Sequence, residues 1–316
     1  SAEGSQVPLR TNGRLVRFVG RNRIRDSWLA TILATVAFPM FLVKLVKARL
    51  ARGSWRETLF QLFSWGSPTC QTRLLETTPG AVRFVCISDT HMMHERLAIP
   101  SGDVLVHTGD FTNHGSLAEV RQFATWFAQQ PHRMKILVPG NHDMIMDSEY
   151  YSAFWADWSS VKEDPASALA AFDNPSVHVL IDKFIEVDGV RVFGSPWVPR
   201  YAPWQTAFNK VPAELQAHWA SKVPGGIDVL LTHTPPNGIL DRESTGVHCG
   251  CGHLASLLST RPNPPRFHVF GHIHSDYGSE VRGATTFVNA ASVSDYYSVG
   301  GRRPIVFDVV PNRQST

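Results

Sequence analysis

The sequence predicts an α/β fold built on a parallel sheet, and two observations lead to this class. Five short apolar runs, rich in Val, Ile and Phe, are spread between residues 82 and 270. Runs of this length and composition are typical of strands that are covered on both faces. A helical pattern also lies between two of the runs, and alternating strands and helices are typical of parallel sheets.

The predicted strands are residues 82–87, 104–106, 136–138, 229–231 and 267–270. Between the second and the third, the spacing predicts a helix over residues 117–129, because Leu117, Val120, Phe123 and Phe127 share one face. His107 and His268 fall within or beside apolar runs, so we expect them to be core histidines rather than ligands.

Each predicted strand is followed by a short polar block that places a metal-ligating side chain beside a small residue. The blocks are Asp89-Thr90-His91, Gly109-Asp110, Gly140-Asn141-His142-Asp143, Thr232-His233-Thr234 and Gly271-His272-Ile273-His274. Ligands in open α/β sheets bind beyond the carboxyl ends of the strands, so we expect the blocks to converge. Together they offer enough donors for two metal ions and one further His for proton transfer.

The ordered set of blocks resembles the motifs of the calcineurin-like metallophosphoesterases, and the finer detail resembles the MPPED-type branch. That detail includes the stretches 101–112, 194–197, 231–236 and 268–290. The resemblance implies a four-layer α/β/β/α sandwich. It covers the chain from about residue 80, so we expect a catalytic domain over residues 80–316 and a separate helical extension over residues 1–79.

A dinuclear site needs a bridging carboxylate, and Asp110 is the natural bridge. The family pattern implies the other ligands: Asp89, His91 and His274 on one metal, with Asn141, His233 and His272 on the other. Mixed nitrogen and oxygen ligands favour two divalent transition metals, Mn, Fe or Zn, over Ca or Mg. The sequence leaves the choice among the three open.

These residue types predict hydrolysis of a phosphoester by a hydroxide that bridges the metals. His142 follows a predicted ligand, so we expect it to act as a general acid or to contact the leaving group, and Asp143 is expected to orient it. The resemblance implies phosphodiester hydrolysis, with cyclic nucleotides among the substrate classes. Two alternatives stay open: a non-phosphate metabolite as substrate, or a scaffold protein with a vestigial site.

The charge distribution argues against a nucleic-acid partner. Residues 1–56 hold eleven Lys or Arg against two acids, a net charge of +9, so the remaining chain carries −6 of the overall +3. An acidic catalytic domain is poorly suited to a phosphate backbone, which clustered Lys and Arg recognise. Small phosphoesters or metabolites fit this charge better.

The basic N-terminal segment predicts contact with a membrane surface through residues 10–65. An uncharged apolar run over 27–43 is shorter than the ~20 residues that a span needs, and Pro39 interrupts it. Basic residues on both flanks favour association with one anionic face, which implies an intracellular protein at the cytoplasmic side. The alternative is a helical pair that packs on the catalytic domain or at a dimer interface, so the oligomeric state stays open.

The stretch from His248 to His253 suggests a second metal site, since it contains two Cys and two His. Its spacing is too tight for the usual pairing of zinc ligands. Leu254, Leu257 and Leu258 follow at helical spacing, so we expect Gly252 and His253 to begin a helix instead. Four scattered Cys in 316 residues do not form a disulfide framework, which indicates a reducing compartment.

Overall fold

The computed structural model describes residues 78–200 and 206–311. The predicted extension over residues 1–79, including its membrane-associating segment, lies outside the described residues apart from positions 78 and 79. None of the helices in the described ranges is long and apolar enough to cross a bilayer.

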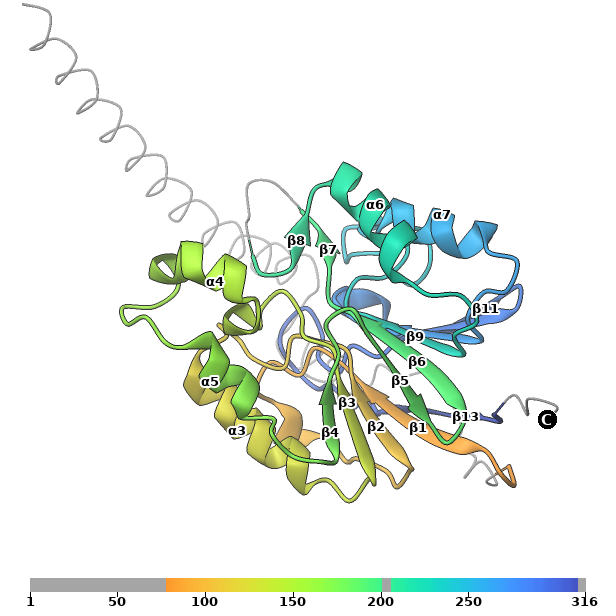
Figure 1. Cartoon of the computed structure of the whole chain (residues 1–316), viewed down its shortest axis with the longest axis horizontal. Helices are drawn as coiled ribbons and strands as arrows, with labels where there is room; N and C mark the ends of the chain where they lie inside the picture. The colour runs from red at the N-terminus through yellow and green to blue at the C-terminus, as the bar shows by residue number, and fades with distance from the viewer. Residues whose placement is uncertain (1–77, 201–205, 312–316) are drawn as a thin grey trace, which may run out of the picture. The chain divides into compact units, whose positions relative to one another are not determined.

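Two sheets form the centre of the catalytic unit (Figure 1). The first has the order β13-β1-β2-β3-β4, in which β1 to β4 are parallel and β13 is antiparallel. Its strands are β1 (Val82–Ile87), β2 (Val104–His107), β3 (Met134–Leu137), β4 (Val177–Val179) and β13 (Ile305–Val309). The predicted strands over 82–87, 104–106 and 136–138 fall in this sheet.

The second sheet has the order β11-β12-β10-β9-β6-β5, with antiparallel strands at both edges. Its strands are β5 (Lys183–Val187), β6 (Val190–Ser195), β9 (Val229–Thr232), β10 (Phe267–Phe270), β11 (Gly278–Arg282) and β12 (Thr285–Asn289). The remaining predicted strands are β9 and β10. A separate pair, β7 (Val198–Pro199) and β8 (Asn209–Lys210), forms a small parallel ribbon.

The helices cover the outer faces of the two sheets. They are α3 (Leu117–Gln129), α4 (Ser148–Phe154), α5 (Pro165–Ala170), α6 (Pro212–Lys222) and α7 (Gly252–Thr260). Figure 1 shows α3 and α5 beside the first sheet and α6 and α7 beside the second, whereas α4 lies above α5 in this view. The helix predicted over 117–129 is confirmed, and α7 begins at Gly252 as expected.

Side-chain alternation along the strands separates three apolar layers. In β1, Val85 and Ile87 pack with Phe123 of α3, whereas Phe84 and Cys86 pack in the cluster between the sheets. A third cluster joins the outer face of the second sheet to α6 and α7, where Trp219 is fully buried. Successive side chains of a strand point to opposite faces, so one strand serves two layers. The four-layer α/β/β/α sandwich is therefore confirmed.

The start of α3 also fixes a loop beside the site. Ser116 and Glu119 form a capping box, in which each side chain accepts a hydrogen bond from the other residue's backbone. Glu119 also accepts from the backbone N–H groups of Asn113 and His114, at 3.3 and 3.2 Å. The helix terminus thereby holds the segment that leads away from β2.

Candidate metal centre

The five polar blocks follow β1, β2, β3, β9 and β10 and meet at one edge of the two sheets. The backbone N–H of His272, after β10, donates to both carboxylate oxygens of Asp89, after β1, at 3.0 Å. This bond joins the carboxyl ends of strands from different sheets. A Cβ atom on Gly271 would lie 2.0 Å from Asp89 Oδ2, so only glycine permits this approach.

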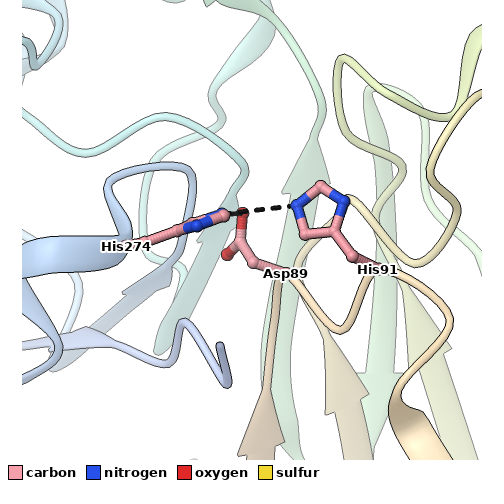
Figure 2. A group of neighbouring side chains, drawn as sticks. All are labelled: Asp89, His91 and His274. Atoms are coloured by element: carbon pink, nitrogen blue, oxygen red, sulfur yellow. Dashed lines mark hydrogen bonds and ion pairs between the residues drawn. The ribbon is translucent and has the colours of Figure 1, made fainter. Parts of the chain in front are cut away.

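The first group of candidate ligands contains Asp89, His91 and His274, and Figure 2 shows the three side chains turned toward one another. One donor atom from each lies within 4.8 Å of the others. His274 Nε2 is 3.3 Å from His91 Nε2 and 3.5 Å from Asp89 Oδ1. Three donors that face one point fit a single bound cation.

The second group contains Asp110, His233 and His272, under the same limit of 4.8 Å. Asn141 adds an oxygen, because its Oδ1 lies 3.0 Å from His233 Nε2. Asp110 Oδ2 lies 3.3 Å from His233 Nε2 and 3.9 Å from His91 Nε2 in the first group. Asp110 therefore stands between the two groups, in the position that a bridging ligand requires.

Backbone carbonyls set the direction of two imidazoles. His91 Nδ1 lies 3.2 Å from the Thr112 carbonyl, and His233 Nδ1 lies 2.8 Å from the Thr108 carbonyl. A carbonyl can only accept, so each Nδ1 carries a proton and each Nε2 faces the centre. Metal-ligating histidines are commonly oriented in this way, and the donor sets present here therefore fit divalent cations.

The backbone of the site is strained at four of the seven predicted ligands. Asp89, His91, Asp110 and His272 have φ angles of 50°, 41°, 56° and 69°. Residues with a side chain adopt this left-handed region at a cost of ~1 kcal/mol or more. Such strain persists only where surrounding contacts hold the chain, and it is concentrated at functional sites.

The buried carboxylates of the centre favour positive charge beside them. Burial alone would raise the pKa of Asp89, but the hydrogen bond from His274 and the positive charges of His233 and His274 hold it at about 2. Burial would likewise lower the pKa of His233, but Asp110 outweighs it and raises the pKa to about 9. Buried carboxylates thus draw positive charge to this point, and a bound divalent metal would supply that charge in place of the His233 proton.

His142 borders the first group without belonging to it. Its ring meets the ring of His91 edge-on, with centroids 4.9 Å apart, and its Nδ1 lies 2.9 Å from the Asn113 carbonyl. Nδ1 therefore carries a proton, and Nε2 is the atom left to exchange a proton with a substrate.

The contacts of Asp143 differ from the orienting role that the sequence suggested. Its Oδ2 accepts from the backbone N–H groups of Asp110 and Gly140, and its Oδ1 accepts from the N–H and hydroxyl of Thr112. These bonds join the loops after β2 and β3, and the Asn113 carbonyl holds the His142 ring instead. Adjacent residues of a tight loop can direct their side chains to different partners, and here Asp143 bonds to the two loops while Asn113 bonds to His142.

Several contributors to the site carry no motif. Thr108, Thr112 and Asn113 act through carbonyl oxygens, which every residue possesses, so no sequence pattern could have identified them. Tyr297, 44% exposed, has its ring edge-on to His91 and His274. A residue so far along the chain could be found only from the fold.

The two histidines expected in the core are buried and also hold site loops. His107 Nε2 lies 3.0 Å from the Thr90 hydroxyl, and His268 Nε2 lies 2.8 Å from the Thr232 hydroxyl. His107 links β2 to the loop after β1, and His268 links β10 to the last residue of β9, directly before His233.

The stretch from His248 to His253 does not form one of the two candidate metal groups found among the described residues. His248 pairs with Asp241, and Cys251 is buried, where its sulfur accepts from Trp219 Nε1 at 3.3 Å. The stretch therefore stabilises the loop before α7 and the start of that helix.

The fold and the two sets of metal donors are those expected of a metal-dependent hydrolase. Comparison with known proteins points to the same class. Residues 82–276 match the family model for calcineurin-like phosphoesterases. The chain belongs to this family and is a metal-dependent phosphoesterase, as predicted.

Particular relatives place it near the expected branch. Metallophosphoesterase domain-containing protein 1 of Homo sapiens and that of Mus musculus are each 36% identical over 245 residues, covering 75% of this chain and 74% of theirs. The UPF0046 protein C25E10.12 of Caenorhabditis elegans is 37% identical over 243 residues, covering 72% of this chain and 81% of its own.

Proposed function

We propose that this phosphoesterase hydrolyses small phosphodiesters, with cyclic nucleotides among its substrates, at a centre that binds two divalent transition metals. The observation that supports the proposal is the position of Asp110 Oδ2, within 3.9 Å of a donor in each ligand group. Mixed imidazole, carboxylate and amide donors favour Mn, Fe or Zn. When bound, two such metals supply a hydroxide at neutral pH and neutralise charge on the phosphoryl oxygens.

The residues of the chain would divide the remaining work. Asp89, His91 and His274 hold one metal, Asn141, His233 and His272 hold the other, and Asp110 bridges them. His142 Nε2 donates a proton to the leaving oxygen while its Nδ1–H remains bonded to Asn113. Asp143 keeps the Asp110 and Asn141 loops in register.

A panel of phosphoesters tests the proposal. The metal-loaded full chain should hydrolyse a nitrophenyl phosphodiester and cyclic nucleotides faster than the matching monoesters, and the Asp110→Ala variant should hydrolyse none of them. Preference for monoesters would overturn the diesterase assignment. Failure on every phosphoester by metal-loaded protein would favour the alternatives, a non-phosphate substrate or a scaffold role.

A further inference from the structure

A cavity of about 430 Å³ opens directly beside the candidate metal centre. His272 and His274, one from each ligand group, form part of its wall. A substrate whose phosphoryl group lies at the metals would extend one of its ester groups into this space. The chemistry of the remaining wall therefore bears on which ester groups are accepted.

Another part of the cavity wall, with Glu243, Ser244 and Cys249, belongs to the loop between β9 and α7. This loop is anchored by the fully buried Asp241. The Asp241 carboxylate accepts from the backbone N–H groups of Gly238 and Gly250, at 3.0 and 2.9 Å, and from His248 Nδ1 at 2.5 Å.

Three further hydrogen bonds tie this loop to the segment that carries the histidines. Asn289 Nδ2 donates to the carbonyls of Leu240 and Ile273, at 3.0 and 2.8 Å. The backbone N–H of Arg242 donates to Asp276 at 2.8 Å. The loop wall and the metal ligands are therefore fixed relative to each other.

The charged groups that line the cavity, apart from the histidines, are acidic. Glu243 and Asp295 line the cavity, together with the neutral side chains of Ser244 and Tyr297. No Lys or Arg is among the lining residues of the described chain. Asp295 also attracts Arg302, so Glu243 should account for the larger part of the effective charge.

We propose that the cavity receives the non-reacting ester group of the substrate and selects it by charge, preferring a cationic group to a neutral one and a neutral one to an anionic one. The inference rests on the proposed diesterase function. Carboxylates at the rim attract an ammonium group and repel a carboxylate or a second phosphate. Among diesters of two separate alcohols, the preferred class is therefore one with an amino or quaternary ammonium alcohol on one side.

Three diesters of the same nitrophenol test the selection. They carry choline, ethanol or 3-hydroxypropionate as the second alcohol, so the leaving group and the coloured product are identical. For the full chain loaded with Mn²⁺, kcat/KM should fall in that order, with roughly fivefold or more between the first and the last. The difference should shrink in 1 M salt, where the Debye length is only about 3 Å.

Variants distinguish the effect of the acidic side chains on selectivity from that of the metals, whose positive charge also acts on these esters. Glu243→Gln should reduce the ratio of kcat/KM for the choline and propionate esters, and the double variant with Asp295→Asn should reduce it further. The matched control is Asp157→Asn with Glu186→Gln, two exposed acids outside the cavity wall, which should leave the ratio unchanged.

The outcomes distinguish the two proposals. Hydrolysis of all three esters without the charge order, or an order that the double variant leaves intact, would overturn the cavity assignment and leave the diesterase function standing. Failure to hydrolyse any of the three would refute the diesterase function, and the cavity assignment with it.

Discussion

At the scale of single residues, the centre depends on groups that hold the ligands as much as on the ligands themselves. Two imidazoles are directed by the carbonyls of Thr108 and Thr112, and the His142 ring is directed by the carbonyl of Asn113. Asp143 makes four hydrogen bonds and has none of its surface exposed. We therefore expect His142 to transfer the proton, whereas its neighbour Asp143 supports the loops.

Substitution of these two neighbours should give opposite results. His142→Ala should keep its metal content but lose roughly 10²–10⁴-fold in rate on esters with poor leaving groups, and less on nitrophenyl esters. Asp143→Asn should lose metal and lower the melting temperature, because the amide NH2 can accept none of the N–H bonds that one carboxylate oxygen now accepts. Elemental analysis, thermal unfolding and kinetics of both variants provide the measurement. An Asp143→Asn variant that kept its metals and lost rate on the same esters as His142→Ala would indicate that Asp143 orients His142 after all.

The candidate ligands could be predicted from the sequence because each lies only a few residues beyond the end of an apolar strand. The carbonyl partners were not, since a carbonyl carries no residue identity. Tyr297, Glu243 and Asp295 were also missed, because only tertiary folding brings the segments around 243 and 295 to the strands' carboxyl ends.

At the scale of elements, the buried parallel strands and α3 were predictable, whereas the edge strands were not. In β5, Lys183, Phe184 and Glu186 are exposed, so its sequence lacks the apolar run that marks a central strand. β13 joins the first sheet from the far end of the chain, and its pairing with β1 is a long-range contact. Local sequence patterns contain little information about such pairings.

The bond between these two strands offers a test of the sheet. Arg83 of β1 makes two hydrogen bonds to Asp308 of β13, at 2.8 and 2.9 Å, and this pairing lowers the pKa of Asp308. Asp308→Asn should therefore reduce the free energy of unfolding by about 1 kcal/mol at pH 7.

The contribution of the Arg83–Asp308 pair to the free energy of unfolding should depend on pH, and the lowered pKa of Asp308 gives the sign. A carboxyl group whose pKa is lowered in the folded state stabilises the fold at pH values above its unfolded pKa of about 3.9. This contribution to stability is lost as the pH falls through the pKa of the folded state. Urea unfolding at pH 7, 5 and 3 should thus show a difference between wild type and Asp308→Asn that is constant from 7 to 5 and narrows below about pH 4. A difference that persisted unchanged at pH 3 would show that the pair contributes by packing alone.

At the scale of the whole molecule, charge divides the chain. The +9 of residues 1–56 contrasts with the −6 of the rest, which includes the catalytic unit. We propose that the basic segment brings the enzyme to an anionic lipid surface through residues 10–65, and that residues 80–316 fold and bind metal independently. Both statements come from the sequence, since the described residues begin at position 78.

Liposome flotation tests this division. The full chain should float with vesicles that contain phosphatidylserine and should be released by high salt, because attraction to anionic lipid is screened. The chain without residues 1–79 should stay unbound yet keep its metals and its rate on small water-soluble esters. A full chain that fails to float, or a truncated chain that unfolds, would assign the segment to the core or to an interface.

The two-metal centre is tested most directly by counting metal atoms in active protein. Wild-type protein, purified without chelators and assayed before elemental analysis, should contain two Mn, Fe or Zn atoms per chain. The Asp110→Ala variant should lose metal from both positions while its circular dichroism stays native, because the three apolar layers do not include Asp110. Fully active wild-type protein with one metal or only traces, or an Asp110→Ala variant that retains two, would contradict a centre bridged by Asp110.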